Sequence, residues 1–233
     1  MKRITIVLAI MLMAGVANAG PIYDMEVGGL YAEGDYVEVV CATVTAVTEY
    51  GCAIAEVPFG MGNSTWVYLG SGHTTLVGDI VTVNAPYTEY YDLTELDVGH
   101  NTVDPGVATF VTVGVCTEMP APIFITAAEI MAAPEHYESC MVWITDGFHV
   151  TELLTYGEWS ADSHEDGTQI RFDDYWFDET VLAVADCANW AVGMWTYAYS
   201  NFKLHPTVDG FPAVQCAVAS DETSLDAIKA LYR

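Results

Sequence analysis

Short runs of alternating apolar and polar residues, rich in valine and threonine, dominate the first half of the chain. Such runs are typical of strands with one buried face. They predict five strands, at residues 36–48, 52–57, 64–69, 80–91 and 93–98. In the first run the alternation slips near Val39 and Val40, which predicts a β-bulge. Five short strands, of which the first and fourth are long, predict a closed five-stranded barrel.

A similar order of runs follows residue 116. Thr126 and Glu129 form a capping box that predicts a short helix over residues 126–133, and Pro134 would end it. Four further strands are predicted, at residues 140–154, 168–173, 190–199 and 202–205. Because the strand lengths recur in the same order, the sequence predicts an internal duplication and a second barrel. Residues 107–116 predict one more strand, which either closes the first barrel or leads to the second.

The two ends of the chain have a different character. Residues 1–19 carry Lys2 and Arg3, an apolar run and a small-residue cleavage pattern, which predict a secretory signal peptide. An uncleaved anchor is the alternative. Residues 217–233 predict a tail with a short helix that either packs on the protein or serves as a sorting or docking tag. We therefore expect a first barrel over residues 20–116, a second over 117–216, and a secreted or periplasmic protein without a membrane span.

The charge of the chain is strongly negative. It has 32 acidic and six basic residues, a formal net charge of −26. Cleavage of the signal peptide would leave four bases: Arg171, Lys203, Lys229 and Arg233. Neutralising a phosphate backbone requires clustered Lys and Arg, so this charge disfavours nucleic acid as a partner. Solubility in an extracellular medium explains the acidity, and binding of divalent cations is the alternative.

Six cysteines lie beyond the predicted cleavage site: Cys41, Cys52, Cys116, Cys140, Cys187 and Cys216. An even number in an exported chain predicts up to three disulfides. The alternative is buried free thiols, because Cys41 and Cys140 lie within predicted strands. The sequence contains no C-x-x-C pair and no Cys/His spacing that fits a zinc site.

Several motifs along the chain resemble a known kind of module. They include Gly34-Asp35-Tyr36-Val37-Glu38-Val39, Trp66-Val67-Tyr68, Val77-Gly78-Asp79-Ile80-Val81, Thr126-Ala127-Ala128-Glu129-Ile130 and Asn201-Phe202-Lys203-Leu204-His205-Pro206. Over about residues 22–212 the chain resembles the OB-fold-like modules of secreted bacterial proteins, which often precede the nuclease domains of extracellular nucleases. The resemblance implies an all-β fold of two tandem five-stranded OB-like barrels with short helices, including a short C-terminal helix. It implies no catalytic residues, since those of the relatives lie in a separate domain.

One surface of the first barrel is a candidate for ligand binding. The alternation in residues 64–69 directs Val67 inward and Trp66 and Tyr68 outward, on the face where OB folds often bind ligands. Three aromatic residues border this face near the turn between the fourth and fifth strands: Tyr87, Tyr90 and Tyr91. Exposed rings there could stack on sugars or bases. The alternative is that the second barrel covers the face.

Calcium is the one cofactor that the acidic loops suggest. Asp162, Glu165 and Asp166 offer oxygen ligands in one loop, and residues 173–179 supply further acids. Neither loop has the spacing of an EF-hand, and a solvated loop is the alternative. No motif for nucleophilic catalysis, phosphate binding or a catalytic metal occurs, so we expect no enzyme.

The leading hypothesis is therefore an exported, non-catalytic binding or assembly module. Its partner would be an extracellular protein, a peptide or a glycan, and self-association through strand edges is also considered. The alternative is a nucleic-acid-binding accessory protein related to the OB modules of secreted nucleases, which the charge opposes. A hydrolase with an unrecognised site is a third class, and fold analogy alone does not decide among them.

Overall fold

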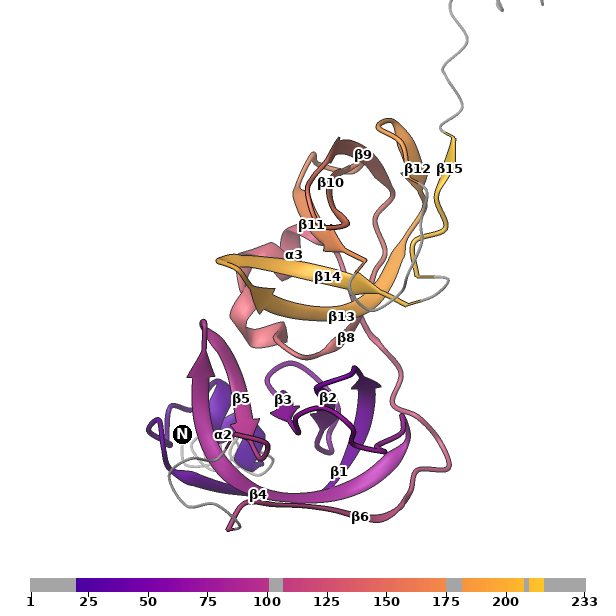
Figure 1. The fold of residues 1–233 in the computed structure, drawn as a ribbon. Coiled ribbons are helices and arrows are strands. Elements are labelled where there is room, and N and C mark those ends of the chain that lie inside the picture. The colour runs from indigo at the N-terminus through magenta and orange to yellow at the C-terminus, as the bar shows by residue number, and fades with distance from the viewer. Residues whose placement is uncertain (1–19, 101–106, 175–181, 208–209, 216–233) are drawn as a thin grey trace, which may run out of the picture.

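The computed structural model describes residues 20–100, 107–174, 182–207 and 210–215, and their regular secondary structure consists almost entirely of strands (Figure 1). The few helices are short, so the predicted all-β class is confirmed. No helix in these described ranges has the length and apolar character needed to cross a membrane. The predicted signal peptide and C-terminal helix lie outside the described residues.

Six strands form the first sheet: β1 (Tyr36–Val47), β2 (Gly51–Ala55), β3 (Ser64–Tyr68), β4 (Asp79–Tyr90), β5 (Leu93–Asp97) and β6 (Thr109–Val115). Five of them form a ring in the order β1-β2-β3-β5-β4, which closes because β4 also pairs with β1. Only β3 and β5 run parallel within this ring. The predicted closed five-stranded barrel of the OB-like kind is therefore confirmed for the first half. Strand β6 pairs with β4 outside the ring and does not close it.

The long strand β1 bends at a bulge. Its register against β4 shifts between Val39 and Ala42, at the position where the sequence alternation slips. The predicted bulge is confirmed, and within it Cys41 has a φ of +60°. The strands enclose an apolar core, and helix α2 (Pro21–Glu26) packs against that core with Ile22 and Met25.

Nine strands form the second sheet: β7 (Ile123–Ile125), β8 (Met141–Ile144), β9 (Phe148–Leu153), β10 (Glu158–Ser163), β11 (Gln169–Asp173), β12 (Asp186–Ala188), β13 (Ala191–Ala198), β14 (Asn201–Pro206) and β15 (Val214–Gln215). Their order is β15-β12-β9-β10-β11-β14-β13-β8-β7, and within the described residues no hydrogen-bonded pairing joins the two ends. The second closed barrel is therefore not confirmed. The single long strand predicted over residues 140–154 is two strands, β8 and β9, separated at Thr145–Gly147. Strand β9 pairs with β10 and strand β8 pairs with β13, so the two flank the series β10-β11-β14-β13. This series has the same order as β2-β3-β5-β4 in the first ring.

Helix α3 (Ala127–Ala132) begins with the predicted capping box. The Thr126 hydroxyl accepts a hydrogen bond from the Glu129 amide at 3.2 Å, and the Glu129 carboxylate accepts one from the Thr126 amide at 2.9 Å. A 3₁₀ helix, η1 (Pro134–Tyr137), follows directly.

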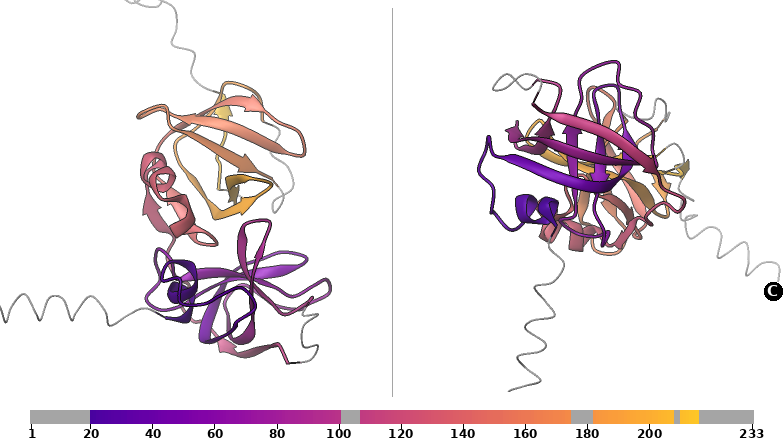
Figure 2. Two further views of the ribbon diagram at one scale, coloured as in Figure 1. Left: turned by 90° about the vertical axis from the view of Figure 1, so that its left-hand side faces the viewer. Right: turned by 90° about the horizontal axis from the view of Figure 1, so that it is seen from below.

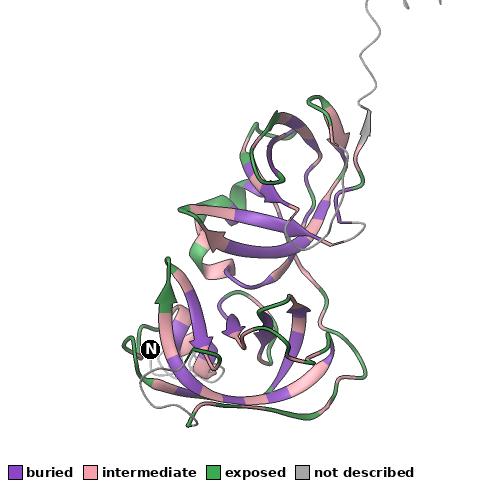
Figure 3. Cartoon of the chain, viewed as in Figure 1, coloured by how far each residue is buried: buried purple, intermediate pink, exposed green. Residues whose placement is uncertain are grey.

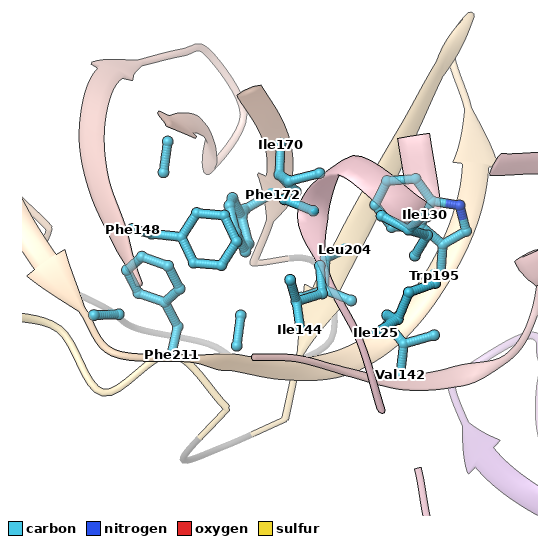
Figure 4. Close-up of a cluster of buried hydrophobic side chains, with 14 of the residues drawn as sticks. Ile125, Ile130, Val142, Ile144, Phe148, Ile170, Phe172, Trp195, Leu204 and Phe211 are labelled. Carbon is cyan, nitrogen blue, oxygen red and sulfur yellow. The ribbon is translucent and has the colours of Figure 1, made fainter. Parts of the chain in front are cut away.

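Aromatic side chains fill the core of the second sheet (Figure 4). Phe172 stacks on Trp159 with ring centroids 5.3 Å apart, and it meets Phe211 at 5.0 Å and Phe148 at 5.5 Å. The two sheets thus have separate cores, and they lie one above the other along the molecule, connected between β6 and β7 (Figure 2).

Candidate functional site at the junction and the hairpin tips

The expected binding face of the first barrel lies against the second sheet. Trp66 is outside the first barrel's core, as predicted, but it is only 8% exposed. It packs with Met194 of β13 and Met141 of β8, and with Leu93 of its own barrel. The expectation of an open stacking surface at Trp66 is therefore corrected. Contact with the second sheet removes the large apolar surface of this ring from water, which favours the covered arrangement.

Tyr68 lies beside the junction and Tyr87 lies against the core of the first barrel, both in partly buried positions. The ring of Tyr68 stacks on His100 with centroids 4.0 Å apart, and its hydroxyl is 3.0 Å from the imidazole Nε2. The Tyr87 hydroxyl donates a hydrogen bond to Glu89, and its ring packs against the barrel core. Burial is the main cause that raises the pKa of both phenols. Both rings have partners within the protein, so neither is a free stacking platform.

Tyr90 and Tyr91 are the predicted aromatic residues that remain exposed. They lie at the tip of the β4–β5 hairpin, with ring centroids 4.7 Å apart in an edge-to-face arrangement. Tyr91 is 75% exposed, and it and Asp92 have φ values of +53° and +64°. Tyr90 pairs with Leu93, so Tyr91 and Asp92 form the whole loop. Such two-residue turns favour Asn and Gly, because a bulky side chain is rarely stable at positive φ.

The β13–β14 hairpin of the second sheet repeats this turn. Ala198 pairs with Asn201, and the loop residues Tyr199 and Ser200 have φ values of +53° and +66°. Tyr199 is 86% exposed and occupies the same loop position as Tyr91. The Lys203 ammonium lies 5.2 Å from the centre of its ring. Tyr199 is not among the residues predicted from the sequence, although it occupies the position equivalent to Tyr91 when the last hairpins of the two predicted repeats are aligned.

A single carboxylate joins these two hairpins close to their turns. Glu138, only 1% exposed, follows η1 and accepts a hydrogen bond from the Thr94 amide of β5 at 3.3 Å. Its other oxygen accepts one from the Tyr197 amide of β13 at 3.2 Å. The two hairpins are therefore held side by side near their turns, and both lie on the left-hand side of Figure 1.

Further carboxyl groups surround this contact. Burial raises the pKa values of Glu138 and Glu26 well above those of ordinary carboxyls. Repulsion from Glu138 raises the pKa of Glu26 further. Burial, with repulsion from Asp97 and Glu89, raises the pKa of Glu95 to about 7. These groups keep their protons at a higher pH than exposed carboxyls do. The junction is thus an acidic region that is partly neutralised by protonation.

Both basic side chains in the described ranges are paired with acids. Lys203 is fully buried in the second sheet, in contact with Glu158 and with Asp173 at 3.0 Å. Arg171 pairs with the other oxygen of Glu158. This network lies across β10, β11 and β14, and it accounts for the charged residues buried there. It leaves no cluster of free bases in the part of the chain that the structure describes.

The predicted calcium ligands do not gather around one point. Asp162 accepts a hydrogen bond from the Gln169 side chain at 3.0 Å, and Asp166 accepts one from the Thr168 amide at 2.8 Å. Glu165 lies between them in the β10–β11 hairpin, where Ser163 accepts a hydrogen bond from its amide. Within the described residues, no group of three or more His, Cys, Asp or Glu side chains could hold a metal ion. Most of the second acidic loop lies outside those residues.

The cysteines are mainly free thiols. Cys52 and Cys140 are buried and reduced, as the alternative interpretation of Cys140 expects. Cys41 and Cys116 are also reduced, Cys41 exposed in the β1 bulge and Cys116 partly exposed. Cys187 is disulfide-bonded, and Cys216 lies outside the described residues. Four free thiols leave at most one of the three disulfides that the cysteine count allows, and Cys52 and Cys140 are buried in different apolar cores.

Comparison with known proteins gives no family assignment. No family model matches the chain, and no curated protein matches it. Among solved structures, the HINa domain of Ifi202 in complex with 20-bp double-stranded DNA is 10% identical over 77% of this chain and 95% of that chain, with a TM-score of 0.35. A murine DNA-binding protein bound to double-stranded DNA is 10% identical over 73% and 93% of the two chains, with a TM-score of 0.36. Similarity at this level carries no argument about fold or function, so the proposals below depend on the chain's own geometry.

Proposed function

We propose that this protein is an exported, non-catalytic binding module that contacts a glycan with the tips of its β4–β5 and β13–β14 hairpins. The observation that carries the proposal is the pair of exposed tyrosines, Tyr91 and Tyr199, at the same turn position of two equivalent hairpins. Glu138 accepts hydrogen bonds from both hairpins two residues from their turns, so one carboxylate holds the two turns that carry the aromatic rings.

The chemistry of the tips suits a sugar. The rings of Tyr90, Tyr91 and Tyr199 offer flat apolar faces on which the C–H faces of a sugar can pack, and their hydroxyls remain free to bond with water or ligand. Carboxylates accept hydrogen bonds from hydroxyl groups, and Glu89 and Asp92 lie on the first hairpin. Retaining a bulky side chain at positive φ costs stability, and such strain is typical of positions kept for function.

Nucleic acid is the rival ligand class. Bases could stack on the same rings, but phosphates would meet an acidic surface, and Arg171 and Lys203 are already paired with carboxylates. We therefore expect no retardation of single- or double-stranded DNA in a gel-shift titration at low salt. Retardation that the tyrosine substitutions abolish would favour the nucleic-acid alternative over a glycan.

The direct test replaces the rings while retaining the turns. Asparagine tolerates positive φ, so Tyr91→Asn and Tyr199→Asn remove the aromatic faces without destabilising the loops. Binding to a panel of neutral and acidic polysaccharides, measured by affinity electrophoresis and calorimetry, should weaken about tenfold for each single variant.

A matched control is available in the same chain. Tyr156 is also exposed and has a φ of +64°, but it lies in the connection between β9 and β10. Tyr156→Asn should leave binding unchanged. If the wild-type protein binds no member of the panel, or if the Tyr91/Tyr199 double variant binds as well as wild type, the proposal is wrong.

A further inference from the structure

Strand β6 is an unprotected edge of the first sheet. Among the described residues, it pairs only with β4, and its other side has no strand beside it. The two outermost strands of the second sheet, β7 and β15, have three residues and two residues, whereas β6 has seven. Proteins commonly blunt such long edges with charges or proline, because free backbone groups recruit further strands.

The side chains of β6 provide none of these protections. Residues 107–116 contain no charged residue and no proline, in a chain whose net charge is −26. Val111, Val113 and Val115 are 51%, 54% and 69% exposed. Figure 3 shows exposed residues along this strand, on the side of the barrel that faces away from the second sheet. The apolar edge is thus separate from both the junction and the hairpin tips.

The apolar character continues onto the neighbouring strands. Val111 pairs with Thr82 of β4, and the bulge of β1 that contains exposed Val40 lies on the other side of β4 at the same level. The pairing of β6 with β4 has one irregularity: its register shifts between Ile80 and Val81, which leaves Val113 as an extra residue. The regular ladder therefore runs from Thr109 to Thr112, centred near Val111.

We propose that β6 pairs antiparallel with β6 of a second copy of this chain, so that the protein associates as a two-fold dimer through this edge. A two-fold axis near Val111 would place this valine opposite its own copy and Thr109 opposite Val113, which joins β-branched side chains to one another. The absence of charge favours a second copy. Carboxylates cover the chain in general, and residues 107–116 are a stretch where two such chains can meet without bringing acids into contact.

The test compares two substitutions that add the same charge at similarly exposed valines. Val111→Glu places two carboxylates opposite each other in the dimer, whereas Val184→Glu changes a valine in the turn before β12 that is 58% exposed. Analytical ultracentrifugation over a wide concentration range should show a concentration-dependent dimer for wild type and for Val184→Glu. Val111→Glu should remain monomeric, with an unchanged circular dichroism spectrum.

A cross-link determines the register independently. In a background with Cys41→Ser and Cys116→Ser, which removes the exposed and the partly exposed free thiol, Val111→Cys should form an intermolecular disulfide on mild oxidation, and Val184→Cys should not. A wild-type protein that stays monomeric at every concentration, or a Val111→Glu variant that dimerises like wild type, would overturn the proposal. Cross-linking that is equal at the two positions would overturn it as well.

Discussion

At the scale of single residues, the junction is defined by carboxyl groups that are buried without basic partners. Glu95 is 4% exposed on β5, where Thr88 is its hydrogen-bonding neighbour and Asp97 and Glu89 are its charged neighbours. Burial and these two acids raise its pKa to about 7, so the native state holds this proton more tightly than the unfolded chain does. The contribution of Glu95 to stability is therefore largest in acid.

This difference predicts how stability changes with pH. The stabilising contribution is complete below the unfolded pKa of about 4.3, and it is lost as the pH rises through about 7. The free energy of unfolding should therefore fall by up to about 3 kcal/mol between pH 4.5 and pH 8 from this group. Urea denaturation at a series of pH values measures the slope.

The substitution Glu95→Gln should flatten this dependence without abolishing it, because Glu26 and Glu138 also have raised pKa values. Glu118→Gln, which removes a charge from the exposed connector after β6, is the matched control. A steeper loss of stability toward acid in wild type, or an unchanged slope in Glu95→Gln, would contradict the assignment.

At the scale of elements, the sequence predicts the first barrel well. Strands β1 and β4 carry long runs rich in valine and threonine, and the alternation in β3 directs Val67 into the core. The bulge in β1 is visible because a change in the alternation is itself the signal. The same reasoning fails for β10, whose sequence EWSADS is polar and does not look like a strand. Its buried Glu158 is stabilised by Lys203 and Arg171, and these partners come from distant strands that a local pattern does not contain.

The candidate site is predictable only in part for a related reason. The pattern correctly places Trp66 outside the first core, but whether that face is open depends on Met194 and Met141, which lie in the other sheet. Tyr199 was detectable in principle, since its turn is equivalent to that of Tyr91. The role of Glu138 could not be read from the sequence, because it depends on two amides from different sheets.

The capping box of α3 supports a prediction at this scale. Replacing Thr126 by alanine removes the hydroxyl that accepts from the Glu129 amide, and this should lower the free energy of unfolding by about 1 kcal/mol. Thr117→Ala, in the exposed connector, should change it far less. Thermal and urea denaturation monitored by circular dichroism make the comparison. Equal effects at the two threonines would show that the cap does not stabilise the native helix.

At the scale of the whole molecule, the junction determines whether the two sheets behave as one body. Their cores are separate, but Trp66, Met194 and Met141 form a third apolar cluster between them. Hydrogen bonds from Gly62 to the His136 carbonyl at 2.7 Å, and from Thr94 to Glu138, also cross the junction. A contact of this kind couples the unfolding of one unit to that of the other. The presentation of Tyr91 beside Tyr199 depends on the same coupling.

A double-mutant cycle across the junction measures this coupling. Trp66→Ala should cost about 3–5 kcal/mol and Met194→Ala about 2–5 kcal/mol, because each leaves a cavity in a packed contact. The double variant should lose less than the sum, by about 0.5–3 kcal/mol, since the first substitution already removes the partner of the second.

Wild type should unfold in one transition by tryptophan fluorescence and by circular dichroism. Met25→Ala, in the first core and away from the junction, should be additive with Met194→Ala. Two separate wild-type transitions, or additivity of Trp66→Ala with Met194→Ala, would mean that the sheets fold independently and that their hairpins are not held in register by the protein.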